Sequence, residues 1–210
     1  MIICDLGLID FHEAFAIQEK LAEAVALGEE ETLLLLEHPP VYTMGSGGKE
    51  ENILDPSIYA VRTNRGGDVT FHGPGQLVGY PVIDLARRGR DLHRYLRFLE
   101  ELIIRVAADF HVAALRVAGR TGVWTGCPLS PAKLASIGVG VRRWVTMHGF
   151  ALNAVNDTMP FRRINPCGIT DCPITSLAME SDGEISMDNV KEGVASRFDL
   201  LLNEMLPIRE

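Results

Sequence analysis

One segment, residues 65–80 (RGGDVTFHGPGQLVGY), constrains the fold more than any other, because it holds five glycines and a proline within sixteen positions. Glycine lets the backbone adopt positive φ angles and come close to a ligand. Arg65 can offer a fork of donors to an anion or a carbonyl group. His72 belongs to the one side-chain type that titrates near neutral pH unaided. This mixture predicts a binding loop rather than a simple turn.

Length and composition limit the classes of protein that this chain can represent. At 210 residues and 47% hydrophobic content, we expect a single domain, residues 1–210, with a sizeable core. A net charge of −8 argues against nucleic acid or an anionic membrane as a partner. No apolar run approaches the roughly 20 residues that span a bilayer. With no visible secretory leader, the four cysteines predict reduced thiols and a cytoplasmic protein.

Hydrophobic periodicity predicts three helices separated by strands. The first helix begins after Asp10, which with Glu13 forms a candidate capping box, and stops at Gly28. The other expected elements are a buried strand at 32–37, a Pro/Gly-rich loop at 38–49, a strand at 76–85, a helix over 92–106 after an Asp91 N-cap, a set of strands within 115–153, and a helix over 190–205.

The order of these elements predicts the fold class. Helix, strands, helix, strands and helix favour an α/β (α+β) domain with a mixed sheet packed with helices over a regular βαβ repeat. Pro81 lies inside the expected strand at 76–85, and proline cannot donate to a sheet ladder. We therefore expect that strand at the edge of the sheet or at a bulge.

Cys167 is the candidate nucleophile. It lies between Pro166 and Gly168, where a thiol can be exposed among free backbone N–H groups that also form an oxyanion hole. The alternative is a buried cysteine that acts as a small apolar residue. Cys172, also beside a proline, is a second candidate nucleophile. The spacing of the two cysteines is not one that zinc sites use, so we expect no metal site.

Lys133 is the only lysine between Lys49 and Lys191. It is either a solvated edge residue or a partner of Cys167. An ammonium about 4 Å from that sulfur would attract a thiolate by roughly 4 kcal/mol at an effective dielectric near 20. This attraction would lower a thiol pKa of about 8.5 to neutral or below.

Two further groups of residues each have two interpretations. His72 and His148 are either two arms of one pocket, with His148 in a supporting role, or hydrogen-bonded core histidines. The arginine pairs 87/88, 142/143 and 162/163 are either a solvated face or a docking surface for an acidic protein. If they dock a partner, at least one pair flanks the mouth of the pocket.

The segment 65–80 resembles the signature of the octanoyltransferases of lipoate biosynthesis, the lipoyl(octanoyl) transferase family. That signature reads Arg-Gly-Gly, two residues, Thr, aromatic, His, two residues, Gly, Gln, one residue, aliphatic, one residue, Tyr. Every specified position matches here. The resemblance extends to residues 36–43 (LEHPPVYT), 133–139 (KLASIGV), 148–153 (HGFALN) and 164–168 (INPCG).

The resemblance implies a specific activity. Such enzymes take an octanoyl group from octanoyl-acyl carrier protein and pass it to a lysine of lipoyl domains in 2-oxoacid dehydrogenase complexes or of the glycine cleavage H protein. It implies that Cys167 forms the acyl-thioester and that Lys133 lowers the pKa of its thiol. It also implies the fold of lipoate and biotin protein ligases, and no metal or nucleotide cofactor. The implied substrate-binding residues are Arg65, Gly66, Gly67, Asp68, Val69, Thr70, Phe71, His72, Ser136, Ile137, Gly138, Gly149, Phe150 and Ala151.

Two alternatives stand beside this interpretation. An ATP-dependent lipoate or biotin ligase would share the fold, but it activates a free acid as an adenylate and needs no nucleophilic cysteine. A non-catalytic acyl-binding module would bind the chain without forming a covalent adduct. Incubation with ATP and free octanoate distinguishes a ligase from a transferase. The mass of the protein after mixing with the acyl donor distinguishes a binding module, which forms no covalent adduct, from a transferase.

Overall fold

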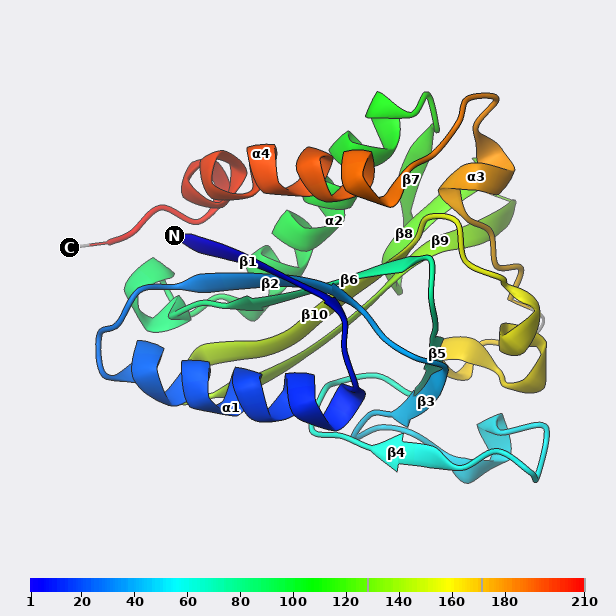
Figure 1. The fold of residues 1–210 in the computed structure, drawn as a ribbon, viewed down its shortest axis with the longest axis horizontal. Coiled ribbons are helices and arrows are strands. Elements are labelled where there is room, and N and C mark those ends of the chain that lie inside the picture. Colours follow the sequence, from blue (N-terminus) through cyan, green and yellow to red (C-terminus); the bar gives the residue numbers. More distant parts are fainter. Residues whose placement is uncertain (128, 171, 210) are drawn as a thin grey trace.

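The computed structural model describes residues 1–127, 129–170 and 172–209, and its centre is a seven-stranded mixed sheet in the order β1-β2-β6-β10-β9-β8-β7 (Figure 1). β1 and β2 are parallel, and the other neighbours in this sheet are antiparallel. The strands of the sheet are β1 (Ile2–Leu8), β2 (Thr32–Glu37), β6 (Gln76–Val82), β7 (Ala114–Val117), β8 (Arg120–Cys127), β9 (Ser130–Arg142) and β10 (Val145–Asn153).

Helices cover both faces of this sheet (Figure 1). One long helix lies on one face and two lie together on the other. The helices are α1 (Phe11–Ala26), α2 (Leu92–Asp109), α3 (Leu177–Glu180) and α4 (Met187–Met205), and the 3₁₀ turns are η1 (Glu50–Asn52), η2 (Leu85–Arg88), η3 (Met159–Arg163) and η4 (Pro166–Gly168). The architecture confirms the predicted mixed sheet packed with helices. Among the described residues, none of the helices combines the length and the apolar character needed to cross a bilayer.

The run of four leucines in β2 explains why helices cover both faces of the sheet. Side chains alternate between the two faces of a strand. Leu33 and Leu35 belong to the larger core, under α2 and α4. Leu34 and Leu36 belong to a second core, under α1. A strand that is apolar at every position must be buried on both faces, and this one is.

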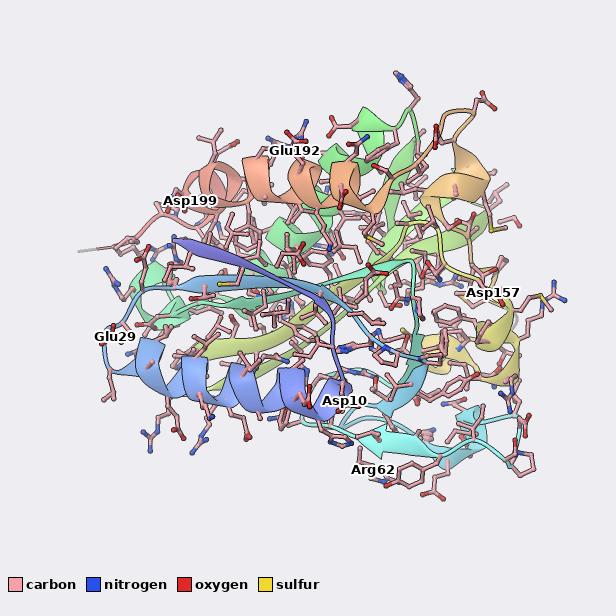
Figure 2. The ribbon with its side chains drawn as sticks, in the orientation of Figure 1. Asp10, Glu29, Arg62, Asp157, Glu192 and Asp199 are labelled. Carbon is pink, nitrogen blue, oxygen red and sulfur yellow. The ribbon has the colours of Figure 1, made fainter. Side chains whose placement is uncertain are left out.

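The N-terminal caps of the helices follow the sequence prediction. The Asp10 carboxylate accepts hydrogen bonds from the first turn of α1, and the Asp91 carboxylate accepts one from the first turn of α2. Figure 2 shows Asp10 and Glu29 at the two ends of α1. Gly28, the predicted stop, has a φ of 99° just after the helix.

A second, three-stranded sheet was not predicted. It has the order β4-β3-β5 and consists of β3 (Val41–Met44), β4 (Ala60–Arg62) and β5 (Val69–His72). The predicted loop at 38–49 was wrong at its centre, because β3 occupies it. Its strands have three or four residues each, which is too short to show a clear alternation against the neighbouring glycines and prolines.

The predicted edge position of Pro81 is also wrong. β6 lies between β2 and β10, and Leu33 pairs with Pro81. The ladder from β6 to β10 ends at Gly79. Beyond it, the Thr146 hydroxyl donates to the Pro81 carbonyl at 2.7 Å and accepts from the Ile83 N–H at 3.0 Å. The Thr146 side chain therefore satisfies backbone groups on either side of the point where the ladder stops, next to a proline whose nitrogen has no hydrogen to donate.

Candidate active site

Lys133 is buried near the start of β9, with 1% of its surface exposed. It pairs with Trp124 of β8 on one side. On the other side its N–H donates to the Pro173 carbonyl at 2.7 Å, and its carbonyl accepts from the Thr175 N–H at 3.0 Å. The interpretation of Lys133 as a solvated edge residue is therefore wrong.

The buried ammonium points at a sulfur atom. Lys133 Nζ lies 2.8 Å from Cys167 Sγ, although the two residues are 34 positions apart in the sequence. The same Nζ lies 5.2 Å from the centre of the Trp124 ring, a distance at which the ring face attracts a cation. Gly122 leaves room for the lysine, because a Cβ there would lie 3.1 Å from Lys133 Cε.

Cys167 occupies a left-handed backbone conformation in the short turn η4, with φ 57° and ψ 25°. Gly168 follows with a φ of 70°. The N–H groups of Gly168 and Ile169 donate to the carbonyls of Asn165 and Pro166 at 3.0 and 3.1 Å. These two N–H groups are therefore engaged within the turn, which differs from the free donors that the sequence suggested around Cys167.

Cys167 also lines a narrow cavity that is partly open to solvent. Most of the predicted substrate-binding residues line it as well. The complete lining is Phe11, Arg65, Gly67, Thr70, His72, Tyr80, Ser136, Ile137, Gly138, His148, Gly149, Phe150, Ala151 and Cys167. Phe11 and Tyr80 were not among the predicted site residues. Tyr80 closes the glycine-rich signature itself, whereas Phe11 belongs to α1 and carries no sequence signal beyond its apolar position.

Four predicted residues do not line the cavity, and the alternation of β5 explains two of them. Thr70 and His72 face the cavity. Val69 and Phe71 face the other way, into a small core with Phe161. The other two predicted residues outside the lining are Gly66 and Asp68.

Arg65 is buried in the wall of this cavity. Its guanidinium donates to the carbonyls of Thr43, Gly66 and Asp68 at 2.8–3.0 Å and to the Thr43 hydroxyl at 3.0 Å. Its Nε has no hydrogen-bond partner, and no carboxylate oxygen lies within 4 Å of the guanidinium in the described part of the chain. A buried cation of this kind favours a negative charge in the cavity.

The cavity histidines are neutral. Burial lowers the pKa of His72 to about 3 and that of His148 to about 4. His72 Nδ1 is 2.8 Å from Gln76 Oε1, and His148 Nε2 is 2.6 Å from Asn64 Oδ1. Both predicted interpretations hold in part, since these are hydrogen-bonded core histidines that also form the wall of one cavity.

The second candidate nucleophile is less suited to the role. Burial raises the pKa of the Cys172 thiol, and Cys172 does not line the cavity. In residues 1–127, 129–170 and 172–209, no group of three or more His, Cys, Asp or Glu side chains is arranged to hold a metal ion.

The three arginine pairs have different environments. Arg88 is buried and forms an ion pair with Glu31 at 2.5 Å, so it serves the fold, whereas Arg87 is exposed. Arg142 and Arg143 lie at the far end of β9, nine residues or roughly 30 Å from Lys133. Arg162 lines a second groove, which also contains residues of the Cys167 turn. That groove is lined by Leu54, Thr158, Phe161, Arg162, Ile164, Asn165, Pro166, Cys172, Pro173, Ile174 and Met179.

Comparison with known proteins gives a consistent result. The family described as the lipoyl protein ligase A/B catalytic domain matches residues 10–199. An octanoyltransferase from Geotalea uraniireducens (strain Rf4) is 66% identical over 211 aligned positions, which cover 100% of this chain and 97% of that protein.

Solved structures share the fold at low identity. A bipartite lipoate protein ligase from Thermoplasma acidophilum superposes with a TM-score of 0.69 at 16% identity, over 96% of this chain and 83% of that one. A biotin protein ligase from Aquifex aeolicus, in complex with biotin and ATP, superposes with a TM-score of 0.58 at 11% identity, over 97% and 71%. These likenesses confirm the predicted fold.

Proposed function

Since the chain belongs to the family of the lipoyl protein ligase A/B catalytic domain and is an acyltransferase that transfers octanoyl groups in lipoate biosynthesis, we propose that its donor is octanoyl-acyl carrier protein and that Cys167 carries the octanoyl group as a thioester. The acceptors are lysines of lipoyl domains in 2-oxoacid dehydrogenase complexes and in the glycine cleavage H protein. The observation that carries this proposal is the 2.8 Å contact between Lys133 Nζ and Cys167 Sγ, beside the cavity that Cys167 and Arg65 line.

The first half-reaction exchanges one thioester for another. The Cys167 thiolate attacks the donor's carbonyl carbon, a new Sγ–C bond forms, and the bond to the carrier's thiol breaks. Lys133 stabilises the attacking thiolate as a nearby cation and then donates a proton to the leaving thiolate. The two thioesters have similar energies, so this step needs no ATP.

The second half-reaction forms the amide. The amine of the lipoyl-domain lysine attacks the octanoyl carbon, the bond to Cys167 Sγ breaks, and the amine's proton passes to the neutral Lys133. A thioester is a higher-energy acyl donor than an amide, which makes the step downhill. The position of Lys133 supports this role, because its Nζ lies 2.8 Å from Cys167 Sγ and is therefore close to the carbon that the amine attacks.

Arg65 is proposed to hold the acyl carbonyl. Its orphan Nε–H is the type of donor that a developing oxyanion needs, and Arg65 and Cys167 line the same cavity. The N–H groups of Gly168 and Ile169 are already engaged. This leaves the guanidinium as the better-supported donor for the charge that forms during both half-reactions.

The groove that contains Arg162 is proposed to receive the carrier protein. It adjoins the Cys167 turn through Asn165 and Pro166. Arg162 is exposed, and in the described part of the chain no carboxylate oxygen lies within 4 Å of it, whereas Arg163 is paired with Asp55 at 2.8 Å. An unpaired arginine beside the nucleophile suits an acidic carrier.

A reconstituted transfer assay tests the proposal. Wild-type protein is incubated with a lipoyl domain and either octanoyl-acyl carrier protein, or ATP with free octanoate, and the mass of the lipoyl domain is followed. We expect octanoylation with the carrier donor alone, and its loss in Cys167→Ala. The variants Cys4→Ser, Cys127→Ser and Cys172→Ser serve as matched controls and keep activity. Octanoylation that requires ATP would instead identify a ligase.

A further inference from the structure

Asn52, at the end of η1, lies between the two segments that build the active site. It is half-buried and was not among the sequence-predicted site residues. We propose that Asn52 is a positioning residue, which ties the Cys167 turn to the glycine-rich segment through Asp68 and so holds the sulfur at Lys133. This inference rests on the proposed role of Cys167 as the acyl carrier.

Asn52 contacts the Cys167 turn through both its backbone and its side chain. The N–H of Asn165 donates to the Asn52 carbonyl at 2.7 Å. The side-chain amide of Asn165 donates to Asn52 Oδ1 at 3.4 Å, a longer and weaker bond. Asn165 immediately precedes the turn Pro166–Gly168. The start of the turn is thus hydrogen-bonded to Asn52.

The other end of the Asn52 side chain is anchored on Asp68. Asn52 Nδ2 donates to Asp68 Oδ2 at 2.6 Å. The second oxygen of Asp68 accepts from the backbone N–H groups of Val69 and Lys49 at 2.6 and 3.2 Å. Asp68 is buried, so this carboxylate is fixed by three donors. Asp68 does not line the cavity, and the clamp gives this predicted substrate-binding residue a different role.

The far side of the turn rests on the same hydrogen bond. A Cβ built on Gly168 would lie 3.2 Å from Asp68 Oδ2 and 3.4 Å from Asn52 Nδ2. Gly168 therefore packs directly against the Asn52–Asp68 pair. The residues before and after Cys167 both contact this clamp, which we define as Asn52 and Asp68.

The backbone of Cys167 explains why a clamp is needed. A non-glycine residue at positive φ is disfavoured unless its surroundings hold it. Without the clamp, the turn would relax and Sγ would leave Lys133. A misplacement of about 1 Å can slow a reaction by 10²-fold.

The test exchanges the two members of the clamp. Asn52→Ala removes the bond to Asp68, and Asn52→Asp sets two carboxylates against each other. The double variant Asn52→Asp with Asp68→Asn restores an amide–carboxylate bond with its direction reversed. Each variant is examined for Cys167 alkylation as a function of pH, for kcat and KM with a small octanoyl thioester, and for thermal unfolding. Asn203→Ala is the matched control, because it deletes an asparagine bonded to Arg88, away from the site.

We expect Asn52→Ala to lower kcat about 10- to 100-fold with little change in KM, and to move the alkylation profile to higher pH. Asn52→Asp is slower still, and the double variant recovers most of the alkylation rate and of kcat. Wild-type kcat and alkylation in Asn52→Ala, or a double variant no faster than Asn52→Asp, would overturn the proposal. If Asn52→Ala does not fold, the comparison of Asn52→Asp with the double variant decides. A failure of the proposed function would appear as the absence of an octanoyl adduct on the wild-type protein. Alkylation needs no octanoyl donor, so it tests the clamp independently of that outcome.

Discussion

The two reacting side chains are held by different kinds of structure. Lys133 belongs to a strand inside the sheet, and backbone hydrogen bonds to Pro173 and Thr175 fix its main chain. Cys167 belongs to a three-residue turn with a left-handed backbone. The cation is therefore fixed by the sheet and the nucleophile by a few local contacts. The fold can keep its cation in place while small changes around the turn adjust the nucleophile.

This difference predicts how substitutions behave. Replacing the Lys133 side chain leaves its backbone bonds intact, so chemistry should be lost with little change in architecture. Replacing residues around the Cys167 turn changes the geometry of the nucleophile itself. Loss of the ammonium should have the largest effect of any substitution at the site other than that of Cys167 itself.

Removing the ammonium tests whether the two groups act as a pair. Lys133→Ala should lower octanoyl transfer about 10³-fold, because the thiolate loses its cation and both proton transfers lose their shuttle. The pH profile of Cys167 alkylation should move to higher pH, because the thiolate loses the cation that lies beside it. Iodoacetamide alkylation followed by mass spectrometry measures the profile.

Lys133→Arg is the control for charge alone. Arginine keeps the positive charge but cannot exchange protons near neutral pH. It should restore alkylation much better than turnover. A Cys167 profile that is the same in wild type and Lys133→Ala would show that the two groups are not coupled.

Crowding the lysine tests whether the sheet fixes its position. A Cβ at Gly122 would lie 2.6 Å from the Ala135 carbonyl and 3.1 Å from Lys133 Cε, at a φ of 120°. We expect Gly122→Ala to displace Lys133 and to lower transfer about tenfold or more, with a loss of about 1–3 kcal/mol in the free energy of unfolding.

Gly119→Ala is the matched control for Gly122→Ala. Its φ is 77°, but a Cβ there would meet nothing within 4 Å. It should therefore lose some stability and keep wild-type kcat. Equal losses of kcat in the two variants would show that backbone strain, rather than contact with Lys133, is responsible.

The neutral histidines predict a loss of stability in acid. Their pKa values in the folded state, about 3 for His72 and about 4 for His148, lie below the unfolded value near 6.5. Between these values the unfolded state binds more protons, so the free energy of unfolding falls as the pH drops below about 6.5. Each histidine contributes at most about 1.4 kcal/mol per pH unit. Urea unfolding of wild type and His148→Asn from pH 7 to 4.5 measures the free energy of unfolding at each pH. Equal slopes of this free energy against pH in the two proteins would refute the assignment of a neutral His148.

The smallest effect concerns the groove that contains Arg162. Arg162→Glu should raise KM for octanoyl-acyl carrier protein several-fold and leave KM for a small octanoyl thioester unchanged, and added salt should reduce the effect. Arg142→Glu, at the far end of β9, is the matched control and should change neither value. If Arg162→Glu affects both donors equally, the groove does not dock the carrier.

Much of this arrangement could be predicted from the sequence, for identifiable reasons. The three long helices carried strong periodicity and recognisable caps at Asp10 and Asp91. Cys167 and Lys133 stood out because each is unusual in its local sequence. Their contact depends on tertiary packing, which sets Lys133 beside both Ile174 and the Cys167 turn, and no local pattern encodes that.

The missed features were those that depend on tertiary contacts. Pro81 lies inside the sheet, where the Thr146 hydroxyl, distant in sequence, donates to its carbonyl. Asn52 carries no motif, and its contacts with Asp68 and Asn165 join segments that are 16 and 113 positions away. The side chains of β5 alternate between cavity and core, as in any strand. This alternation was not predicted, because the segment that contains β5 was interpreted as a loop.

The central claim is that Cys167, held against Lys133, carries the octanoyl group. The most direct measurement is the intact mass of the enzyme after mixing with octanoyl-acyl carrier protein in the absence of an acceptor, followed by peptide mapping of the adduct. The account predicts a gain of one octanoyl group on Cys167, no gain in Cys167→Ala, and discharge of the adduct when a lipoyl domain is added. An adduct on Cys172, or octanoylation of the lipoyl domain by the Cys167→Ala variant, would contradict it.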